Sequence, residues 1–273
     1  MARNVILTST FVDGNRARVD GMKAIAPLLR REDVGEGWGL ELVGTVFMIG
    51  RSGVFVTARH CLANRSADGT FTTIPGLMVC QFTERGTFQF RPVERINVHE
   101  VADVAVGALG FSFLPKGAPV RDTPCMRISF EEPSAGQQVA TFAYPKTRWS
   151  LEGAHQKFEF AANHEAGRVI QFHPNGRDRV LLPGACYETS MKIAGGASGG
   201  PVTTRSGCAF AVNSTGFDVP DGHDPVSYIT PLKEILDLGV SGVSFAGEPP
   251  QRYSIRELID RKLIAVDGRV PAP

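Results

Sequence analysis

The chain lacks any hydrophobic run near the roughly 18 residues that a membrane-spanning helix requires, so we expect no transmembrane helix. It also lacks an excess of charge of either sign. It contains 29 Lys and Arg residues against 28 Asp and Glu residues, which gives a net charge of +1. This balance provides no electrostatic reason to expect a nucleic acid or an anionic membrane surface as a partner.

The cysteines lack the spacing of a metal site or of a disulfide framework. The sequence contains five of them, an odd number, at positions 61, 80, 125, 186 and 208, with no C-x-x-C pair. His155, His164 and His173 also lack the i,i+4 spacing of a zinc-binding helix. We therefore expect free thiols in a reducing compartment and no metal site. The sequence also lacks the phosphate-binding motif G-x-x-x-x-G-K-[ST], and we expect no other cofactor.

The N-terminus lacks a secretory signal. Its longest apolar run spans only Val5 to Leu7 and ends at Thr8, whereas a signal peptide needs an apolar stretch of about 7–15 residues. We therefore predict a cytoplasmic protein, in which residues 1–34 form an N-terminal extension.

Turn-forming residues, by contrast, are abundant, with 30 Gly and 18 Pro in 273 residues. They separate short runs rich in β-branched and aromatic residues, a rhythm typical of an antiparallel barrel or sandwich. The predicted strands span residues 42–49, 54–57, 77–82, 88–98, 104–109, 138–144, 157–161, 168–172, 179–182, 209–214 and 226–229.

Helical periodicity occurs clearly only near the C-terminus. Residues 231–238 begin with Pro and are followed by Gly239, which predicts one short helix. Residues 255–264 follow Ser254, a suitable N-cap, with Glu257 three residues later as the partner of a capping box. We expect this second helix to pack on the body of the protein, within a C-terminal extension over residues 246–273.

Three segments carry residues that could perform acyl transfer. The segment TARHC contains His60, the segment VADVAVGAL contains Asp103, and the segment GGASGGPV contains Ser198. A nucleophilic serine needs a general base for its proton and a carboxylate that holds this base in one tautomer. It also needs backbone N–H groups aimed at the developing oxyanion, and glycines beside the serine allow such a turn.

These segments, in the order His, Asp, Ser, resemble those of the trypsin-like serine peptidases. GTVFMI at residues 44–49, FAYP at 142–145 and FAVNSTG at 210–216 resemble further landmarks of that family. The resemblance covers about residues 40–240. It implies an all-β fold of two antiparallel six-stranded barrels, over about 35–115 and 130–240. The two barrels would make up a peptidase domain spanning 35–245, with the catalytic cleft between them.

The resemblance also implies roles for individual residues in a serine endopeptidase that cleaves proteins or peptides through an acyl-enzyme. His60 would be the general base, Asp103 its orienting carboxylate and Ser198 the nucleophile. The N–H groups of Gly196 and Ser198 would form the oxyanion hole. The substrate-binding pocket would be lined by Lys192, Ile193, Ser214, Thr215, Gly216 and Val226.

The sequence departs from the secreted members of this family at two positions. Ala197 stands where zymogen-type members have an aspartate, and Cys61 has no cysteine on the strand at 44–50 with which to pair. Both departures are typical of bacterial-type members without a zymogen. A regulatory partner acting through residues 1–34 or 246–273 remains open.

Two other functions fit parts of the sequence. GASGG at residues 196–200 matches the G-x-S-x-G motif of α/β-hydrolase esterases, although Pro201 disfavours the helix that should follow the serine. A catalytically silent binding module with a peptidase-like fold is the other alternative.

By the resemblance to the peptidases, Lys192 lies at the base of the substrate pocket, where its charge would oppose a basic substrate side chain. We expect small or medium uncharged residues before the cut, or else acidic residues paired with Lys192.

Overall fold

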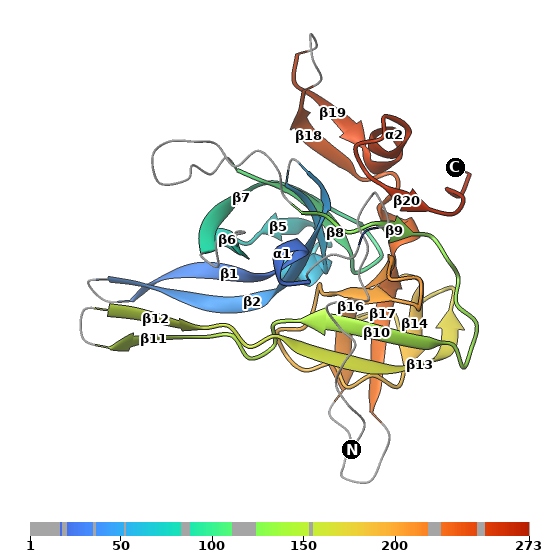
Figure 1. Cartoon of the computed structure of the whole chain (residues 1–273), viewed down its shortest axis with the longest axis horizontal. Coiled ribbons are helices and arrows are strands. Elements are labelled where there is room, and N and C mark those ends of the chain that lie inside the picture. Colours follow the sequence, from blue (N-terminus) through green and yellow to red (C-terminus); the bar gives the residue numbers. More distant parts are fainter. Residues whose placement is uncertain are drawn as a thin grey trace.

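The computed structural model describes residue 17 and residues 21–34, 37–51, 53–82, 88–110, 124–152, 155–217, 225–244 and 249–272. Strands dominate these residues and form two barrels that lie one above the other in Figure 1, with the C-terminal segment on top. The prediction of an all-β fold with two antiparallel barrels is confirmed.

The strands of the first barrel are β1 (Ile25–Val34), β2 (Gly37–Gly50), β3 (Val54–Thr57), β6 (Leu77–Phe82), β7 (Phe88–Val98) and β8 (Ala105–Leu109). They pair antiparallel in the order β1–β2–β3–β8–β7–β6, and β6 pairs back to β1 to close the barrel. The short strands β3 and β8 are buried along their whole length. Such continuous burial explains why their sequences are apolar apart from Gly107 and the buried Thr57.

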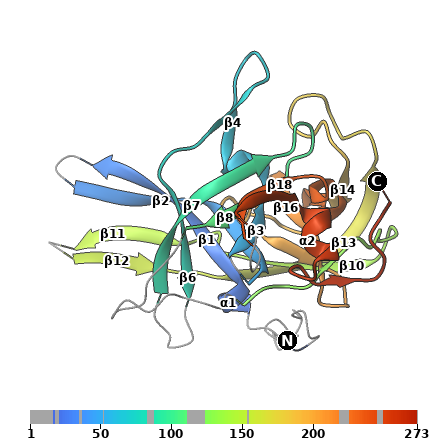
Figure 2. The same ribbon diagram turned by 90° about the horizontal axis from the view of Figure 1, so that it is seen from above.

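A short excursion leaves the first barrel after β3. It contains the 3₁₀ turn η1 (Arg59–Cys61) and the hairpin of β4 (Ala63–Arg65) and β5 (Phe71–Thr73). This hairpin projects from the body of the protein in Figure 2. Because β3 ends at Thr57, the 3₁₀ turn begins just beyond the rim of the barrel.

The strands of the second barrel are β10 (Gln138–Ala143), β13 (Asn163–His173), β14 (Cys186–Thr189), β15 (Pro201–Thr203), β16 (Ala209–Phe217) and β17 (Val226–Pro231). They run in the order β15–β10–β13–β14–β17–β16, and the pairing of β15 with β16 closes the barrel. The helix α1 (Gly21–Ala24) precedes the first barrel. Two hairpins, β1–β2 and that of β11 (Arg148–Glu152) with β12 (His155–Glu159), extend side by side (Figures 1 and 2).

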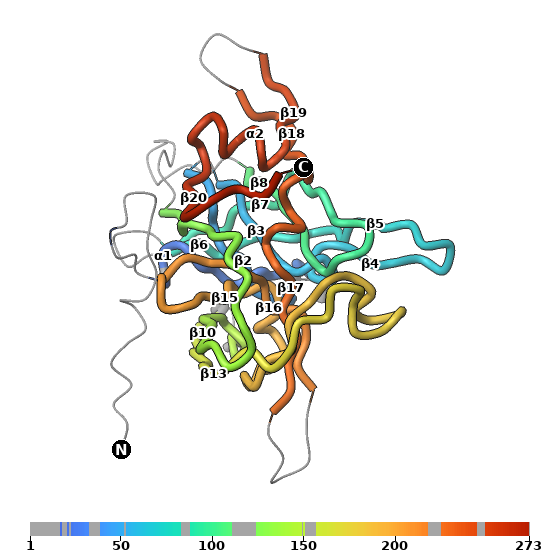
Figure 3. The backbone as a smooth tube through the Cα atoms, turned by 90° about the vertical axis from the view of Figure 1, so that its right-hand side faces the viewer, coloured from blue at the N-terminus to red at the C-terminus, as the bar shows by residue number. Residues whose placement is uncertain are grey.

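The C-terminal segment ties the two barrels together. It contains β18 (Gly239–Val243), β19 (Gln251–Ser254), α2 (Ile255–Asp260) and β20 (Val266–Asp267). The strand β20 pairs in parallel with β9 (Ile128–Ser129), which itself pairs with β16 of the second barrel. The side chains of Ile255 and Leu258 belong to the same apolar core as the first barrel. Figure 3 shows this segment covering one end of the molecule.

The predicted capping box of α2 is present. The Ser254 hydroxyl accepts a hydrogen bond from the Glu257 backbone N–H, and the Glu257 carboxylate accepts one from the Ser254 backbone N–H. The helix predicted over residues 231–238 is shorter than expected. The strand β17 continues to Pro231, and only η2 (Leu232–Ile235) follows, as a 3₁₀ turn.

The expected N-terminal extension over residues 1–34 is corrected at its end. The strand β1 begins at Ile25 and pairs with β2 along its whole length, so the first barrel starts ten residues before the predicted position. Pro27 and the charged residues 30–33 interrupt the apolar pattern by which a strand is found in a sequence.

The predicted strand at 179–182 is also wrong. The Asp178 carboxylate accepts hydrogen bonds from the backbone N–H groups of Val180 and Leu181, which forms a turn in place of a strand ladder.

All five cysteines are free thiols in the structure, and four of them are buried. The cellular compartment predicted from their spacing stays a prediction. Within the residues that the structure describes, no helix has the length and apolar character needed to cross a membrane.

Candidate active site

His60 lies on the 3₁₀ turn η1, directly after β3 of the first barrel. The preceding Ala58 has extended backbone angles and is buried, which fixes where the turn leaves the barrel. The imidazole of His60 is half exposed, whereas the carboxylate of Asp103 is only 7% exposed. The histidine therefore has one side toward the protein and one side open to an incoming molecule.

Asp103 holds His60 at two points. The Nδ1 atom of the imidazole lies 2.9 Å from Oδ2 and 3.1 Å from Oδ1 of Asp103. The backbone N–H of His60 also donates to Oδ1 at 3.1 Å. A carboxylate at Nδ1 favours the tautomer with its proton on that nitrogen, so Nε2 is left as a proton acceptor.

The pair shifts the pKa values of both groups. Burial opposes the charged form of His60, but Cys61 and the Asp103 carboxylate raise the imidazole pKa well above its ordinary 6.5. Burial likewise opposes the charged form of Asp103, yet interaction with His60 lowers the pKa of the carboxyl below its ordinary 3.8. Asp103 is therefore ionised at neutral pH and stabilises a proton on His60.

Ser198 lies in a turn between β14 and β15 of the second barrel. Gly199 has a φ of +85°, and a Cβ there would collide with the Thr57 hydroxyl and the Thr45 carbonyl of the first barrel. Only glycine fits this approach. The carbonyl of Ser198 accepts a hydrogen bond from the Thr45 backbone N–H at 2.8 Å. The two barrels therefore bring the Ser198 turn against the end of β3, which leads into His60.

The hydroxyl of Ser198 donates to the backbone carbonyl of Ser214 at 3.1 Å. Within the described part of the chain, this carbonyl, and not the imidazole of His60, is its hydrogen-bond partner. The Sγ atom of Cys61 lies 3.8 Å from the Ser198 carbonyl oxygen, which places the residue next to His60 directly beside the serine.

Two backbone N–H groups of the Ser198 turn are available to a ligand. Those of Gly196 and Ser198 donate no hydrogen bond to any residue that the structure describes. The orientation of the turn is fixed from the other side, because the Thr45 hydroxyl donates to the Gly196 carbonyl at 3.1 Å. The same hydroxyl accepts the backbone N–H of Tyr144 at 3.1 Å.

The predicted pocket residues Ile193, Gly216, Val226 and Lys192 have different surroundings in the structure. A Cβ at Gly216 would collide with the carbonyl oxygen of Ile193, so these two segments are in contact. Val226 is half-buried in an apolar cluster with Phe217 and Tyr228. Lys192 is exposed, as expected for a lysine that reaches into solvent.

The predicted pocket residues Ser214, Thr215 and Gly216 lie on β16, which pairs with β17. A register shift between Asn213 and Thr215 leaves Ser214 outside the regular ladder with β17. The Ser214 side chain is fully buried, and its hydroxyl lies 2.6 Å from that of Thr230.

Sequence reasoning missed several polar residues that build the site. Thr45 belongs to the GTVFMI landmark, so a signal for it was present. Asn213 is fully buried, and its amide donates to the carbonyl of Ala197, the residue before Ser198, at 3.2 Å. Arg59 and His99 fix the segment before Asp103, and no motif marked their roles.

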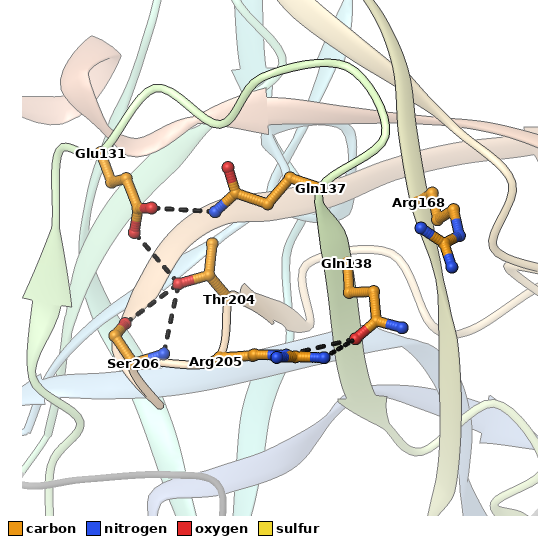
Figure 4. A pocket seen from close by; sticks show the side chains of 7 residues that line it. All are labelled: Glu131, Gln137, Gln138, Arg168, Thr204, Arg205 and Ser206. Carbon is orange, nitrogen blue, oxygen red and sulfur yellow. Dashed lines mark hydrogen bonds between the residues drawn. The ribbon is translucent and has the colours of Figure 1, made fainter.

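A cavity of about 520 Å³ lies away from these residues, at the start of β10 (Figure 4). Its polar lining is already internally hydrogen-bonded. Gln138 accepts from Arg205, and Glu131 accepts from Gln137 and Thr204. No group of three or more His, Cys, Asp or Glu residues suited to a metal ion occurs in the described ranges. The expectation of no metal or cofactor stays a prediction.

A double β-barrel with an oriented imidazole and a glycine-flanked serine defines a peptidase-type architecture. The family described as the trypsin-like peptidase domain matches residues 44–212, a range that contains His60, Asp103 and Ser198. The chain belongs to this family. A comparison with curated protein sequences finds no match.

Solved structures show the same fold. One is the HtrA-type protease AlgW with decapeptide, at 15% identity and a TM-score of 0.52, covering 78% of this chain and 62% of that chain. Another is AlgW with tripeptide, at 16% identity and a TM-score of 0.50, covering 78% of this chain and 57% of that one. The present chain thus spans about three fifths of the length of these proteins.

Proposed function

We propose that the protein is a serine endopeptidase that cleaves peptide bonds through an acyl-enzyme on Ser198. The observation that carries this proposal is the His60–Asp103 pair, oriented through Nδ1, with the Ser198 turn packed against the end of β3, which leads into His60, and hydrogen-bonded to Thr45 of β2. The family match supports a peptidase, because it includes all three residues.

The first half of the reaction forms the acyl-enzyme. The Ser198 hydroxyl turns from the Ser214 carbonyl toward His60, whose Nε2 accepts the hydroxyl proton while Oγ bonds to the substrate carbonyl carbon. The carbonyl oxygen becomes an oxyanion, which the N–H groups of Gly196 and Ser198 stabilise. The tetrahedral intermediate then collapses. The protonated His60 gives its proton to the leaving amine, and the C–N bond breaks.

The second half returns the enzyme to its starting state. A water molecule attacks the ester carbon while His60 accepts one of its protons, and the oxyanion again receives hydrogen bonds from the two N–H groups. The C–Oγ bond breaks, Oγ recovers a proton from His60, and the carboxylic acid leaves. Asp103 stays ionised throughout and stabilises the imidazolium.

We propose that the substrate residue before the cut is small or medium-sized and uncharged. The close contact of Ile193 with Gly216 and the apolar cluster around Val226 support this preference. The exposure of Lys192 weakens the second expectation, an acidic residue paired with that lysine. The segment 214–216 would pair with the substrate backbone.

The alternatives separate in one assay. The α/β-hydrolase fold is excluded by the two antiparallel barrels, so an esterase would have to use the present fold. We expect a fluorophosphonate probe to label the protein, an unstructured protein to be digested, and both activities to vanish in Ser198→Ala. Labelling without digestion would indicate an esterase. The absence of both labelling and digestion would indicate a binding module.

A further inference from the structure

The four residues before Asp103 form a tight connection between β7 and β8, and the structure satisfies most of their backbone polar groups with two side chains. Both belong to residues outside the proposed triad, Arg59 and His99. Arg59 is 7% exposed, an unusual degree of burial for a guanidinium. A buried charge of this kind needs a set of partners that compensates for its lost hydration.

The partners of Arg59 are three consecutive carbonyl groups. Its Nη1 atom lies 3.0 Å from the carbonyl oxygen of His99, 3.1 Å from that of Glu100 and 3.0 Å from that of Val101. The guanidinium also lies over the ring of Phe71, with its carbon 4.7 Å from the ring centroid. Arg59 therefore fixes the path of the chain immediately before Asp103.

His99 satisfies the donors of the same connection. Its Nδ1 atom accepts the backbone N–H of Val101 at 3.1 Å and that of Ala102 at 2.8 Å. This is the pattern by which an Asn or Asp side chain stabilises a turn two residues ahead. It requires an unprotonated Nδ1, and burial lowers the pKa of His99 below its ordinary 6.5.

The charged groups that face His99 come from three elements. Arg59 belongs to η1, and Glu100 follows His99 in the connection. Glu234 lies in η2, and Asp237 lies just after it. The Nε2 atom is 3.7 Å from the Glu234 carboxylate, which favours a proton on Nε2 and leaves Nδ1 free to accept. The ring is thus oriented from both sides.

Arg59 and His60 are neighbours on one 3₁₀ turn. Arg59 donates hydrogen bonds to the carbonyls of the connection. The backbone N–H and the imidazole of His60 bind the Asp103 carboxylate, which follows this connection. We propose that Arg59 and His99 are positioning residues that hold Asp103 against His60. This inference goes beyond the proposed function and rests on it only for its effect on activity.

The direction of one pKa shift separates positioning from simple charge. Removing the Arg59 cation would, by charge alone, raise the pKa of the nearby His60, because a like charge disfavours protonation. Displacing the Asp103 carboxylate would lower the pKa of His60 toward 6.5, because the stabilising partner withdraws. Positioning therefore predicts a downward shift.

The test is an NMR titration of the His60 imidazole in Arg59→Met, which keeps a long apolar side chain and removes the guanidinium donors. We expect a lower His60 pKa and, since small displacements cost heavily in catalysis, about a tenfold to hundredfold slower fluorophosphonate labelling at high pH. Arg65 provides the control, because it is an exposed guanidinium over the same Phe71 ring. Arg65→Met should leave the His60 pKa and the labelling rate unchanged. A His60 pKa that stays constant or rises in Arg59→Met would overturn the proposal.

His99 variants keep the test decisive if Arg59→Met fails to fold. His99→Ala should lower the His60 pKa, whereas His99→Asn, whose oxygen can accept the same N–H groups, should retain the native value. Equal His60 pKa values in the two variants would also overturn the proposal. The titration needs no substrate. An unlabelled wild-type protein would refute the proposed function and leave the positioning test readable.

Discussion

The two barrels differ in how firmly they hold the side chains that they contribute to the candidate site. On the first barrel, the His60–Asp103 pair is fully hydrogen-bonded at Nδ1, and its supporting connection is held by Arg59. On the second barrel, the Ser198 hydroxyl points to the Ser214 carbonyl, and Gly216 lies against Ile193. The imidazole of His60 is therefore oriented without a ligand, whereas the Ser198 hydroxyl would have to rotate to reach it.

This difference follows from what each part contacts. The imidazole is constrained by a buried carboxylate within its own barrel, so its orientation does not depend on a ligand. The serine hydroxyl has a single neutral acceptor and rotates about one side-chain bond. The backbone of its turn is nevertheless fixed, because Thr45 binds both the Ser198 and Gly196 carbonyls.

The largest effect should come from removing either reacting group. We expect Ser198→Ala and His60→Ala each to reduce peptide turnover by about 10⁶-fold, and the double variant to lose little more, because the groups act as one unit. Steady-state cleavage of an unstructured protein measures this. Multiplicative losses in the double variant would show that the two barrels do not act together.

The pH dependence of peptide cleavage should report the pKa of His60 on the first barrel. A base must be unprotonated to accept the serine proton, so kcat/KM should rise with pH, about tenfold per unit, up to the pKa of His60. Since Cys61 and Asp103 together raise the His60 pKa above its ordinary 6.5, the midpoint should lie above 6.5. In Asp103→Asn it should fall, together with the plateau. A wild-type midpoint at or below 6.5 would contradict the geometry of the pair.

Thr45→Val should disturb the Ser198 turn and leave the His60–Asp103 pair unchanged. The substitution keeps the shape of the side chain but removes the donor to Gly196 and the acceptor of Tyr144. The buried N–H of Tyr144 loses its acceptor, at a cost of about 1–3 kcal/mol, and the part-buried carbonyl of Gly196 loses a donor at a smaller cost. We expect slower fluorophosphonate labelling and a lower melting temperature.

The matched control for Thr45→Val is Thr72→Val on the exposed strand β5. It should change neither labelling nor melting. The His60 pKa should stay native in both variants, and a shift in Thr45→Val would show that the two halves are coupled.

Gly216→Ala should disturb substrate binding more than the chemistry. The new Cβ would force the Ile193 carbonyl away and distort the pocket. We expect the KM of small-residue peptides to rise several-fold, with a smaller change in labelling by a compact probe. Gly195→Ala is the comparison, since a Cβ there meets no atom within 4 Å. Equal KM values in both variants would mean that the contact between Gly216 and Ile193 is not part of the substrate pocket.

The smallest effect should come from a site remote from both halves. Ser254→Ala removes the capping box of α2 and should lower the free energy of unfolding by about 1 kcal/mol. Denaturant unfolding measures this change. Activity and the His60 pKa should remain native, and a loss of activity would show that the C-terminal segment supports the site.

Sequence reasoning located the strands whose pattern is local. Residues 54–57, 77–82 and 88–98 were predicted with the bounds that β3, β6 and β7 have in the structure. The strand β1 was missed because charged residues and Pro27 obscure its alternation, and its pairing with β2 and β6 is a tertiary property. Propensity alone cannot supply such a pairing.

The candidate site shows the same division. His60, Asp103 and Ser198 could be proposed from the sequence because each lies in a short string of characteristic residues. Arg59 was missed because its partners lie about 40 residues further along the chain and are backbone carbonyls, which no residue type encodes. The orientation of the Ser198 hydroxyl and the contact of Gly216 with Ile193 likewise depend on packing that no motif describes.

The most direct test of the account is an active-site titration with a fluorophosphonate. Peptide hydrolysis is measured as the modified fraction of protein increases, and the modified residue is identified by mass spectrometry. The account predicts that hydrolysis falls linearly to zero at one equivalent, with the adduct on Ser198. Hydrolysis that persists when Ser198 is fully modified would contradict it.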